Sequence, residues 1–157
     1  MMPNKISIWI ISFSFMILIS CRSNSFKEYH SFTNNCWNTD SIISLKIPII
    51  DTKKKYDLSL RIRHTVNYEF QNLFLFVDHT NRDTVEIILA DKNGKWLGRG
   101  VSDLREFDFL LEKGKYFSKN EKDILLIEQA MRYGPLEKIT DLNHISDIGL
   151  IISESDE

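Results

Sequence analysis

A cysteine near the N-terminus lies in a setting that directs a covalent modification. It follows residues 6–19, an uncharged and mainly apolar run of 14 residues. A membrane-spanning helix needs about 20 apolar residues, so this shorter run is typical of a signal-peptide core. The run ends in Leu18-Ile19-Ser20-Cys21, which resembles the bacterial lipobox: an aliphatic residue, a tolerant position, a small residue and a cysteine. The pattern predicts lipidation of Cys21, with diacylglycerol on the thiol and fatty acids such as palmitate as the membrane anchor.

The lipobox divides the chain into three parts. Residues 1–20 are the predicted signal peptide, residues 21–36 a lipidated tether, and residues 37–157 a single folded domain. With Cys21 acylated, Cys36 is the one thiol that remains, so we expect no intrachain disulfide. The domain must then be stabilised by its hydrophobic core, for which its length is sufficient.

Other groups that could perform chemistry are scattered along the chain. The four histidines lie far apart: His30, His64, His79 and His144. None has the spacing of a zinc site, and His64 falls on the apolar face of a predicted strand, where a histidine is more often a core residue than a ligand. Cys36 is more often a buried thiol than a nucleophile in such a setting. We therefore expect no enzymatic activity, no metal site and no cofactor.

Composition and charge narrow the class of protein further. The chain has 20 Lys and Arg against 22 Asp and Glu, and this balance argues against a nucleic-acid partner, because phosphate binding needs a basic face. Hydrophobic residues make up 43% of the chain, as in a globular protein. Alanine occurs only at Ala90 and Ala130, whereas isoleucine occurs 21 times. A chain poor in the best helix former and rich in β-branched residues favours sheet.

Hydrophobic alternation predicts the strands directly. Tyr56–Tyr68 alternates over seven steps, as expected for a half-buried antiparallel strand. Ser41–Ile50 also alternates, and Pro48 places that strand at a sheet edge because proline lacks the N–H of a ladder bond. Asn72–Asp78 is apolar throughout, which is typical of a strand covered on both faces. Asp91-Lys92-Asn93-Gly94 predicts a hairpin with a type I′ turn.

The remaining segments complete an all-β prediction. Gly98 and Gly100 indicate a bulge or a close backbone approach in the strand after the hairpin turn. Phe107–Leu111 is ambiguous between strand and helical turn, Ile124–Arg132 favours a strand, and Ile148–Ile152 is the closing strand. Seven or eight short strands without a long helical period predict an antiparallel β-sandwich, with a jelly roll as one form of it.

Two groups of side chains are candidates for partner or glycan binding. The first consists of large aromatics that could stack on sugar rings, as in sandwich lectins: Trp37, Tyr56, Tyr68, Trp96 and Tyr133. The alternative is that these rings fill the core. The second consists of arginines: Arg61 and Arg63 project from one strand face, where they either bind an acidic partner or pair with Glu86 across the sheet, and Arg132 is a further candidate.

Short motifs spread over the mature chain carry a family resemblance. The most specific stretch is Asp83-Thr84-Val85-Glu86, followed by Trp96-Leu97-Gly98. Further matching residues, in chain order, are Tyr29, Trp37, Tyr56-Asp57-Leu58, Leu60-Arg61, residues 68–76, Leu89-Ala90-Asp91, Gly94, Gly100, Gln129-Ala130-Met131-Arg132, Leu136 and Asp147-Ile148-Gly149-Leu150. On these residues the chain resembles the GldH family of gliding-motility lipoproteins of the Bacteroidota. Relative to the family pattern, residues 140–146 look inserted.

The resemblance implies a role but no reaction. It implies an accessory protein of the envelope machinery for surface gliding, which is coupled to type IX secretion, with protein partners in that machinery and a membrane contact through the acyl chains. Family context implies the outer membrane. Arg22-Ser23-Asn24-Ser25 lacks the acidic run that often accompanies surface export in these bacteria, so we expect the periplasmic face. The alternative function is a glycan-binding β-sandwich module.

Overall fold

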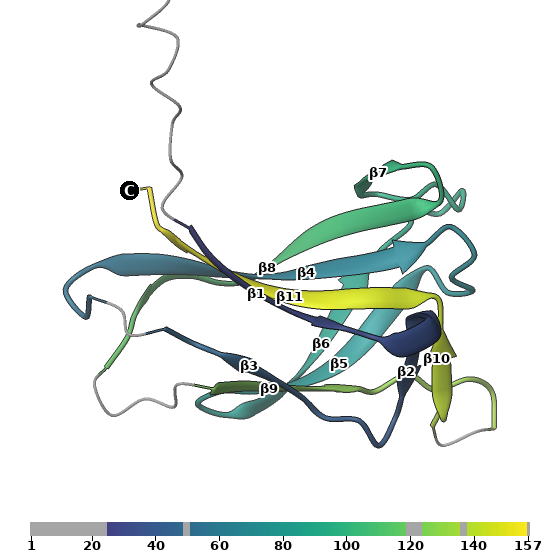
Figure 1. The fold of residues 1–157 in the computed structure, drawn as a ribbon, viewed down its shortest axis with the longest axis horizontal. Coiled ribbons are helices and arrows are strands. Elements are labelled where there is room, and N and C mark those ends of the chain that lie inside the picture. The colour runs from purple at the N-terminus through teal and green to yellow at the C-terminus, as the bar shows by residue number, and fades with distance from the viewer. Residues whose placement is uncertain (1–24, 49–50, 119–123, 136–137, 157) are drawn as a thin grey trace, which may run out of the picture.

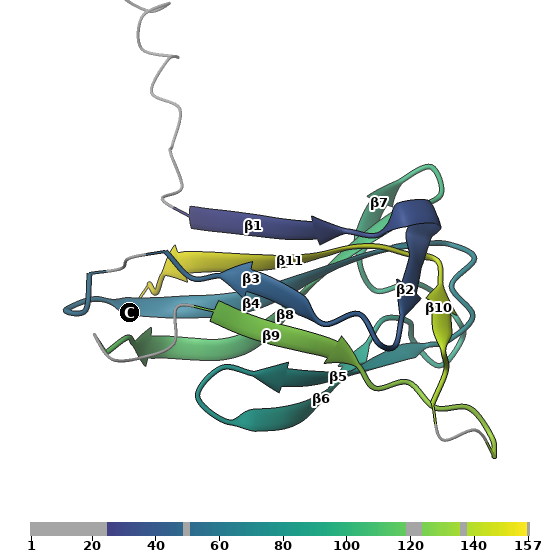
Figure 2. The ribbon, with the colours of Figure 1, turned by 60° about the horizontal axis from the view of Figure 1, so that its bottom comes forward.

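The computed structural model describes residues 25–48, 51–118, 124–135 and 138–156. The predicted signal peptide and Cys21 lie outside the described residues. The described chain is almost entirely strand, arranged as two facing antiparallel sheets with a small third sheet at one end (Figures 1 and 2). The sheets do not close into a barrel, and this arrangement confirms the predicted all-β sandwich.

Each sheet mixes segments that are distant in sequence. The five-stranded sheet contains, in spatial order, β1 (Ser25–Ser31), β11 (Ile145–Glu154), β4 (Lys55–Thr65), β8 (Leu104–Tyr116) and β7 (Arg99–Val101). The four-stranded sheet contains β3 (Ile43–Lys46), β9 (Ile124–Gln129), β5 (Asn72–Asp78) and β6 (Arg82–Ile88). The third sheet pairs β10 (Asp141–Asn143) with β2 (Cys36–Asn38), which follows the 3-10 turn η1 (Thr33–Asn35). The described residues thus form eleven strands rather than seven or eight, because three strands are only three residues long and β1 was expected to be tether.

The core lies between the inner faces of the two large sheets. From β4, Leu58, Leu60 and Ile62 point inward and are fully buried, as the alternation of Tyr56–Tyr68 predicts. Across the interface, Leu73 and Leu75 of β5 are equally inaccessible. Burying a side chain of this size contributes about 1.5–3 kcal/mol, so these rows hold the two layers together.

Residues 25–36 correct the predicted domain boundaries. They were expected to belong to a tether, yet all seven residues of β1 pair with β11, and the N–H of Phe32 donates to the carbonyl oxygen of Ser146 at 2.9 Å. The Phe32 ring also stacks on Trp37, with ring centroids 4.8 Å apart. The domain therefore begins at Ser25 among the described residues, and only three residues separate Cys21 from the first strand.

Edge and turn predictions have mixed outcomes. β3 is an edge strand of its sheet, as Pro48 predicted. The hairpin over Asp91–Gly94 exists, but its turn is not type I′, because Gly94 has a positive φ (79°) whereas Asn93 does not. The N–H of Gly94 donates to the carbonyl of Asp91, and the N–H of Asp91 donates to that of Lys95, which describes a type I turn closed by a glycine bulge. The Asp91 carboxylate accepts the N–H of Asn93 at 2.8 Å and stabilises this alternative.

Close backbone approach explains Gly98 and Gly100. A Cβ at Gly98 would lie 2.2 Å from the carbonyl oxygen of Glu106, and one at Gly100 would lie 2.1 Å from that of Leu104. The ambiguous segment Phe107–Leu111 lies within the long strand β8. The strands predicted at Ile124–Arg132 and Ile148–Ile152 are present as β9 and β11, respectively.

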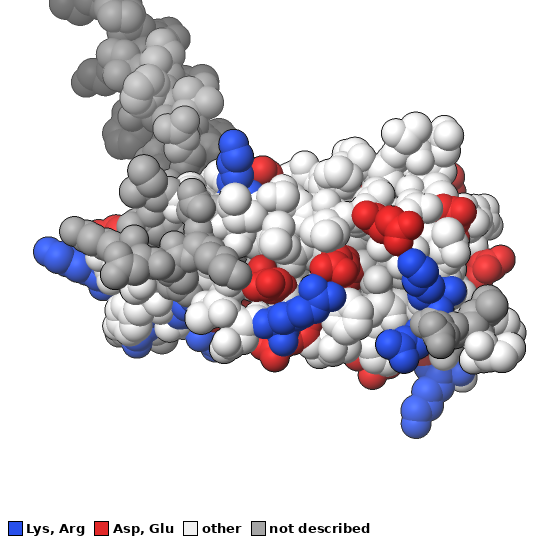
Figure 3. Space-filling view, turned by 90° about the horizontal axis from the view of Figure 1, so that it is seen from below, with Lys and Arg blue, Asp and Glu red and all other residues white. Residues whose placement is uncertain are grey.

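The prediction that Asn72–Asp78 is covered on both faces is wrong. Its burial alternates, with Phe74 and Phe76 on the outer face half-buried. The guanidinium of Arg82 lies over the Phe76 ring at 4.6 Å and also pairs with Glu128, so long polar side chains shield the ring in place of another element. Figure 3, from the side of this sheet, shows a mainly uncharged surface with small groups of charged side chains.

A chain that begins at Trp37, the predicted start of the domain, tests the revised boundary. It lacks β1, exposes the edge of β11 and loses the packing of Phe26 and Phe32 at the core margin. We expect its free energy of unfolding to lie about 3 kcal/mol or more below that of a chain that begins at Ser25, measured by urea unfolding. Equal values for the two chains would mean that residues 25–36 do not contribute to the fold.

Candidate functional site

A ladder of ion pairs crosses the outer face of the five-stranded sheet. Strand register places Arg61 opposite Asp108 and Arg63 opposite Glu106. Nε of Arg61 lies 2.5 Å from Oδ1 of Asp108, and Nε of Arg63 lies 2.8 Å from Oε2 of Glu106. Arg99 of β7 extends the ladder, with Nη2 2.8 Å from Oε1 of Glu106. These contacts define the charged ladder as Arg61, Arg63, Arg99, Glu106 and Asp108.

Glu86 is not the partner of these arginines. It lies on β6 in the other sheet, where Oε1 accepts a hydrogen bond from Nδ2 of Asn72 at 2.7 Å. The expected cross-strand pairing of Arg61 and Arg63 exists, but its partners come from β8. Arg99 is the most exposed arginine of the charged ladder, with a side chain 70% exposed against 32% for Arg63 and 12% for Arg61.

Tyr29 of β1 joins the ladder through a gap at Gly149. Nη1 of Arg61 donates to the Tyr29 hydroxyl at 3.2 Å, and the guanidinium of Arg63 lies over the Tyr29 ring at 4.9 Å. A Cβ on Gly149 would lie 2.5 Å from two carbons of that ring. Only a glycine between β1 and β4 therefore lets the tyrosine reach the arginines.

The ladder shifts the pKa values of its own carboxyl groups. A hydrogen bond from Arg61 lowers the pKa of Asp108 below its usual value. Burial acts to raise the pKa of Glu106, but hydrogen bonds from Arg99 and Arg63 lower it on balance. The Asp108 carboxylate likewise raises the pKa of Arg61. The positive and negative charges of the ladder therefore compensate one another within the sheet. This indicates that the ladder is a structural network.

A chain of contacting rings runs through one end of the sandwich. Tyr68 is at its centre, 5.6 Å between centroids from His64 and from Phe70, and 6.4 Å from Trp96. Phe70 in turn contacts Tyr133 edge-on at 6.1 Å. We call His64, Tyr68, Phe70, Trp96 and Tyr133 the aromatic cluster. Its exposure is graded, since Tyr68 is 4% and Tyr133 67% exposed.

The burial of two aromatic residues corrects their prediction as candidate binding residues. Trp37 is fully buried and its Nε1 donates to the carbonyl of Ser41 at 3.0 Å, while Tyr68 is buried and donates to the carbonyl of Asn72 at 3.0 Å. Both are core residues and present no surface to a sugar or a protein. Tyr56 is half-buried against Phe117, at the other end of the sandwich.

His64 is a core histidine, as the sequence favoured. Its Nδ1 lies 2.9 Å from the carbonyl oxygen of Thr65, and its ring meets that of Trp96 at 4.5 Å. Burial lowers its pKa. The neutral imidazole is therefore favoured, and the ring packs as an aromatic residue.

Tyr133 forms one wall of a shallow cavity of about 190 Å³. The other lining residues come from three segments of the chain: Glu69, Phe70, Ile139, Asp141, Leu142 and Asn143. Arg132, also exposed, is the neighbour of Tyr133 in the chain. Of the candidate binding residues, the structure brings Trp96 and Tyr133 into one cluster and leaves Arg132 beside it. Sequence reasoning missed Phe70 and the residues of β10, because only the pairing of β10 with β2 brings them here.

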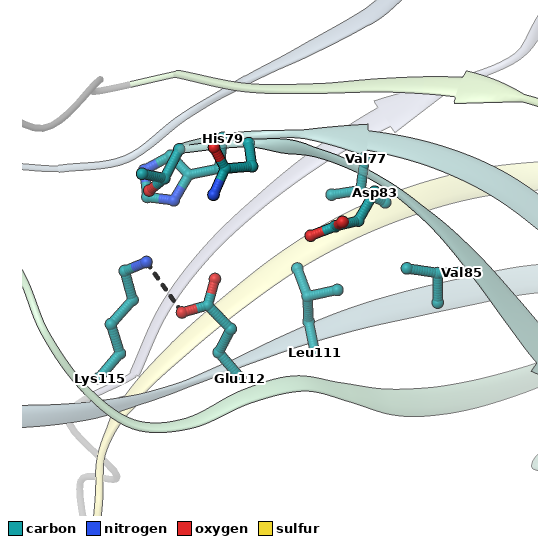
Figure 4. Close-up of a pocket in the computed structure, with 9 residues that line it drawn as sticks. Val77, His79, Asp83, Val85, Leu111, Glu112 and Lys115 are labelled. Atoms are coloured by element: carbon teal, nitrogen blue, oxygen red, sulfur yellow. Dashed lines mark ion pairs between the residues drawn. The ribbon is translucent and has the colours of Figure 1, made fainter.

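A second cavity, of about 410 Å³, opens between the two sheets on the side of β6 and β8 (Figure 4). Val77, Val85 and Leu111 form its apolar wall. Glu112 and Lys115, on the same strand as Leu111, form an ion pair of 2.8 Å at the cavity. No motif in the sequence indicates this cavity.

The described residues hold no group of three or more His, Cys, Asp or Glu side chains placed to bind a metal ion. Over the same part of the chain, no helix is long and apolar enough to span a bilayer.

Fold and surface together define an antiparallel β-sandwich protein with an internally compensated ion-pair network and an aromatic cluster at one end. Comparison with known proteins gives the family. The sequence profile of the GldH lipoprotein family matches residues 24–152. The gliding motility lipoprotein GldH of Flavobacterium johnsoniae is 32% identical over 155 residues, which cover 94% of this chain and 96% of that protein. A GldH homolog of Christiangramia forsetii is 32% identical over 163 residues and 99% of both chains.

This chain therefore belongs to the GldH family of gliding-motility lipoproteins, and the predicted resemblance is confirmed. Among solved structures, the coat protein of Tobacco streak virus aligns with a TM-score of 0.34 and 13% identity over 88% of this chain and 92% of that one. A similarity of that size supports no statement about fold or function.

The charged ladder gives a pH-dependent prediction. The folded-state pKa values of Asp108 and Glu106 lie below their unfolded values, so the ladder stabilises the fold at neutral pH. This stabilisation is lost as the pH falls below about 4, through the folded-state values. Arg61→Met removes the most buried of the cations that contact Asp108 and Glu106, and leaves Asp108 with only the longer contact to Arg99 among the described residues. We expect it to lower the free energy of unfolding by about 1–3 kcal/mol at pH 7, with the deficit shrinking towards pH 3, measured by urea unfolding at each pH.

Arg82→Met is the matched control for this measurement. Arg82 also forms a two-bonded pair with a carboxylate, that of Glu128, but its side chain is 49% exposed, against 12% for Arg61. Exposed pairs contribute little, so we expect a small effect of Arg82→Met at every pH. A deficit for Arg61→Met that does not change with pH would contradict the electrostatic account.

Proposed function

We propose that this protein is a lipid-anchored accessory component of the gliding-motility apparatus, coupled to type IX secretion, that acts through contacts with other proteins and not through catalysis. Family membership supports the motility role. The observation that carries the contact role is the exposure of Tyr133 on a rigid aromatic cluster at one end of the sandwich.

The start of β1 and the Tyr133 cavity lie at opposite ends of the described fold. The first strand begins at Ser25, four residues after Cys21, and four extended residues reach at most about 14 Å. An acylated Cys21 therefore holds the end of the sandwich that carries Ser25 close to the bilayer. Figure 1 shows β1 entering at one end, whereas β10, beside the Tyr133 cavity, lies at the other. The aromatic end is thus presented away from the membrane.

Exposed aromatic rings that are held in place are favourable contact residues. Tyrosine buries a large area on binding while losing little side-chain entropy, and it is enriched where interfaces concentrate their binding energy. The Tyr133 ring rests on Phe70, so its position is set before a partner arrives. The ladder arginines already pair with carboxylates, so they contribute less to such a contact.

The proposed location is the periplasmic face of the outer membrane. Support for this face comes from Arg22-Ser23-Asn24-Ser25, which contains no acidic residue. Protease treatment of intact cells tests it. We expect the domain to stay protected until the outer membrane is opened, and its release from intact cells would place it on the cell surface.

Site-specific photo-crosslinking tests the contact surface in the full acylated chain. A photoreactive phenylalanine analogue at Tyr133 should crosslink to motility or secretion components in growing cells, because this ring faces away from the anchor. The matched control is Tyr116, a second exposed tyrosine (57%) that pairs with Lys55 at the opposite end. Crosslinks to those components from Tyr116 and none from Tyr133 would reverse the assignment.

The substitution Cys21→Ser tests the anchor. In cells that carry it, we expect the chain to be lost from the membrane fraction.

A glycan-binding module is the second candidate function. The specific observation is that carboxylate and amide side chains of Glu69, Asp141 and Asn143 line the cavity beside the Tyr133 ring. Sugar recognition uses such a combination of a ring and hydrogen-bonding groups. A glycan array probed with the folded chain should show consistent binding that Tyr133→Ala abolishes. If wild type binds no glycan, this candidate is excluded.

A further inference from the structure

The two long sides of the sandwich differ. On one side the edge strands β1 and β3 contact each other, and Oε2 of Glu28 accepts the N–H of Lys46 at 2.9 Å. On the other side the edge strand β6 and the part of β8 that lies beyond its short pairing with β7 are separated by the cavity of about 410 Å³. The sandwich is therefore closed along one side and open along the other. We call the opening between β6 and β8 the lateral groove.

β6 offers a regular strand edge at this groove. Its seven residues pair with β5 without a register shift, and among the described strands none pairs with its outer edge. β6 contains no proline and no glycine. β8, by contrast, carries two register shifts against β4, which make its own edge irregular. An additional strand would therefore extend the sheet at β6.

The inward side chains of β6 determine which strand fits. Register with β5 places Asp83 opposite Val77, Val85 opposite Leu75 and Ile87 opposite Leu73, so all three share the inner face. Val85 is half-buried at the groove wall, where it faces Leu111. Asp83 lines the same cavity, and within the described residues its carboxylate has neither an ion pair nor a hydrogen bond. The nearest pair in the cavity, Glu112 with Lys115, is already neutral as a unit.

We propose that the lateral groove binds an extended segment of a partner protein, which adds to β6 as a further strand and places one basic and one apolar side chain between the sheets. The basic side chain pairs with Asp83, and the apolar one packs on Val85 and Leu111. An inward-pointing charge at a strand edge discourages indiscriminate pairing, and it is relieved only by a partner that brings the opposite charge. The inference goes beyond the proposed function, because it concerns a different surface and holds or fails independently of Tyr133.

The register gives the segment a readable pattern. All the pairs among the described strands are antiparallel, and in that direction the segment meets Ile87, Val85 and Asp83 in turn. Side chains that face the groove are two residues apart, so the segment has an apolar residue followed two positions later by a basic one. Main-chain hydrogen bonds give the affinity of such an addition, and the alternate side chains give its specificity.

The experiment uses the full acylated chain in detergent micelles and a blocked octapeptide, Gly-Thr-Val-Thr-Val-Thr-Lys-Gly. We expect saturable binding by titration calorimetry and slower hydrogen exchange of the β6 amides with peptide present. Asp83→Lys should weaken binding about tenfold or more, since it turns an attraction into a repulsion. With a second peptide, in which glutamate replaces the lysine, we expect the Asp83→Lys variant to bind more tightly than the wild-type protein. Because Asp83 is exposed and its carboxylate forms no ion pair or hydrogen bond with another described residue, the variant is expected to fold.

Asp103→Lys is the control for non-specific charge effects. Asp103 is an exposed residue between β7 and β8, away from the groove, and we expect wild-type affinity there. The proposal is overturned if the peptide does not bind saturably, or if Asp83→Lys and Asp103→Lys weaken binding equally. It is also overturned if the chain forms a dimer that Asp83→Lys dissociates, because a second copy would then be the occupant. None of these results bears on the Tyr133 crosslinks.

Discussion

The alternation of β4 is the constraint on which the rest of the structure depends. Its inward residues Leu58, Leu60 and Ile62 are fully buried, and its outward residues Arg61 and Arg63 pair with β8. β4 is hydrogen-bonded on both sides, to β11 and to β8. A slip of one residue would place guanidinium groups in the core and leucines in water, so the core and the charged ladder select the same register. The gap at Gly149 adds a third requirement, because only this register sets Tyr29 beside the arginines.

The sequence predicts those features of the fold that depend on the residues of a single strand. β4 and the edge position of β3 follow from alternation and from one proline. β1 does not, since its inward positions are Phe26, Glu28 and His30, and two polar residues of three hide the period. Those polar residues are accommodated because β1 is an edge strand, where Glu28 reaches the backbone of β3. The pattern did not predict the turn type at Asp91–Gly94 either, because the Asp91 carboxylate stabilises the observed turn by accepting the N–H groups of Asn93 and Lys95.

For the candidate site, residue type could be predicted but exposure could not. From the sequence alone, large aromatics such as Trp37 and Tyr133 could lie in the core or on the surface. In the structure Trp37 is buried and Tyr133 is exposed. What distinguishes them is tertiary structure: Trp37 belongs to β2, which pairs with β10, and its ring stacks on Phe32, whereas Tyr133 follows β9 of the four-stranded sheet. Asp83 gives a similar case. Its place in the most specific family stretch was apparent, but its inward direction depends on pairing with Val77.

The start of β1, the aromatic cluster and the lateral groove are formed by different residues, and this separation bears on how an accessory protein could work. The groove shares no lining residue with the Tyr133 cavity, so a segment lying on β6 leaves Tyr133 uncovered. Sites that share no side chains are energetically additive to a first approximation. A chain held at the bilayer by one end could then bind two partners together, and each would raise the effective concentration of the other. Joining other components side by side requires no reactive group, only a rigid sandwich that keeps its surfaces at fixed positions.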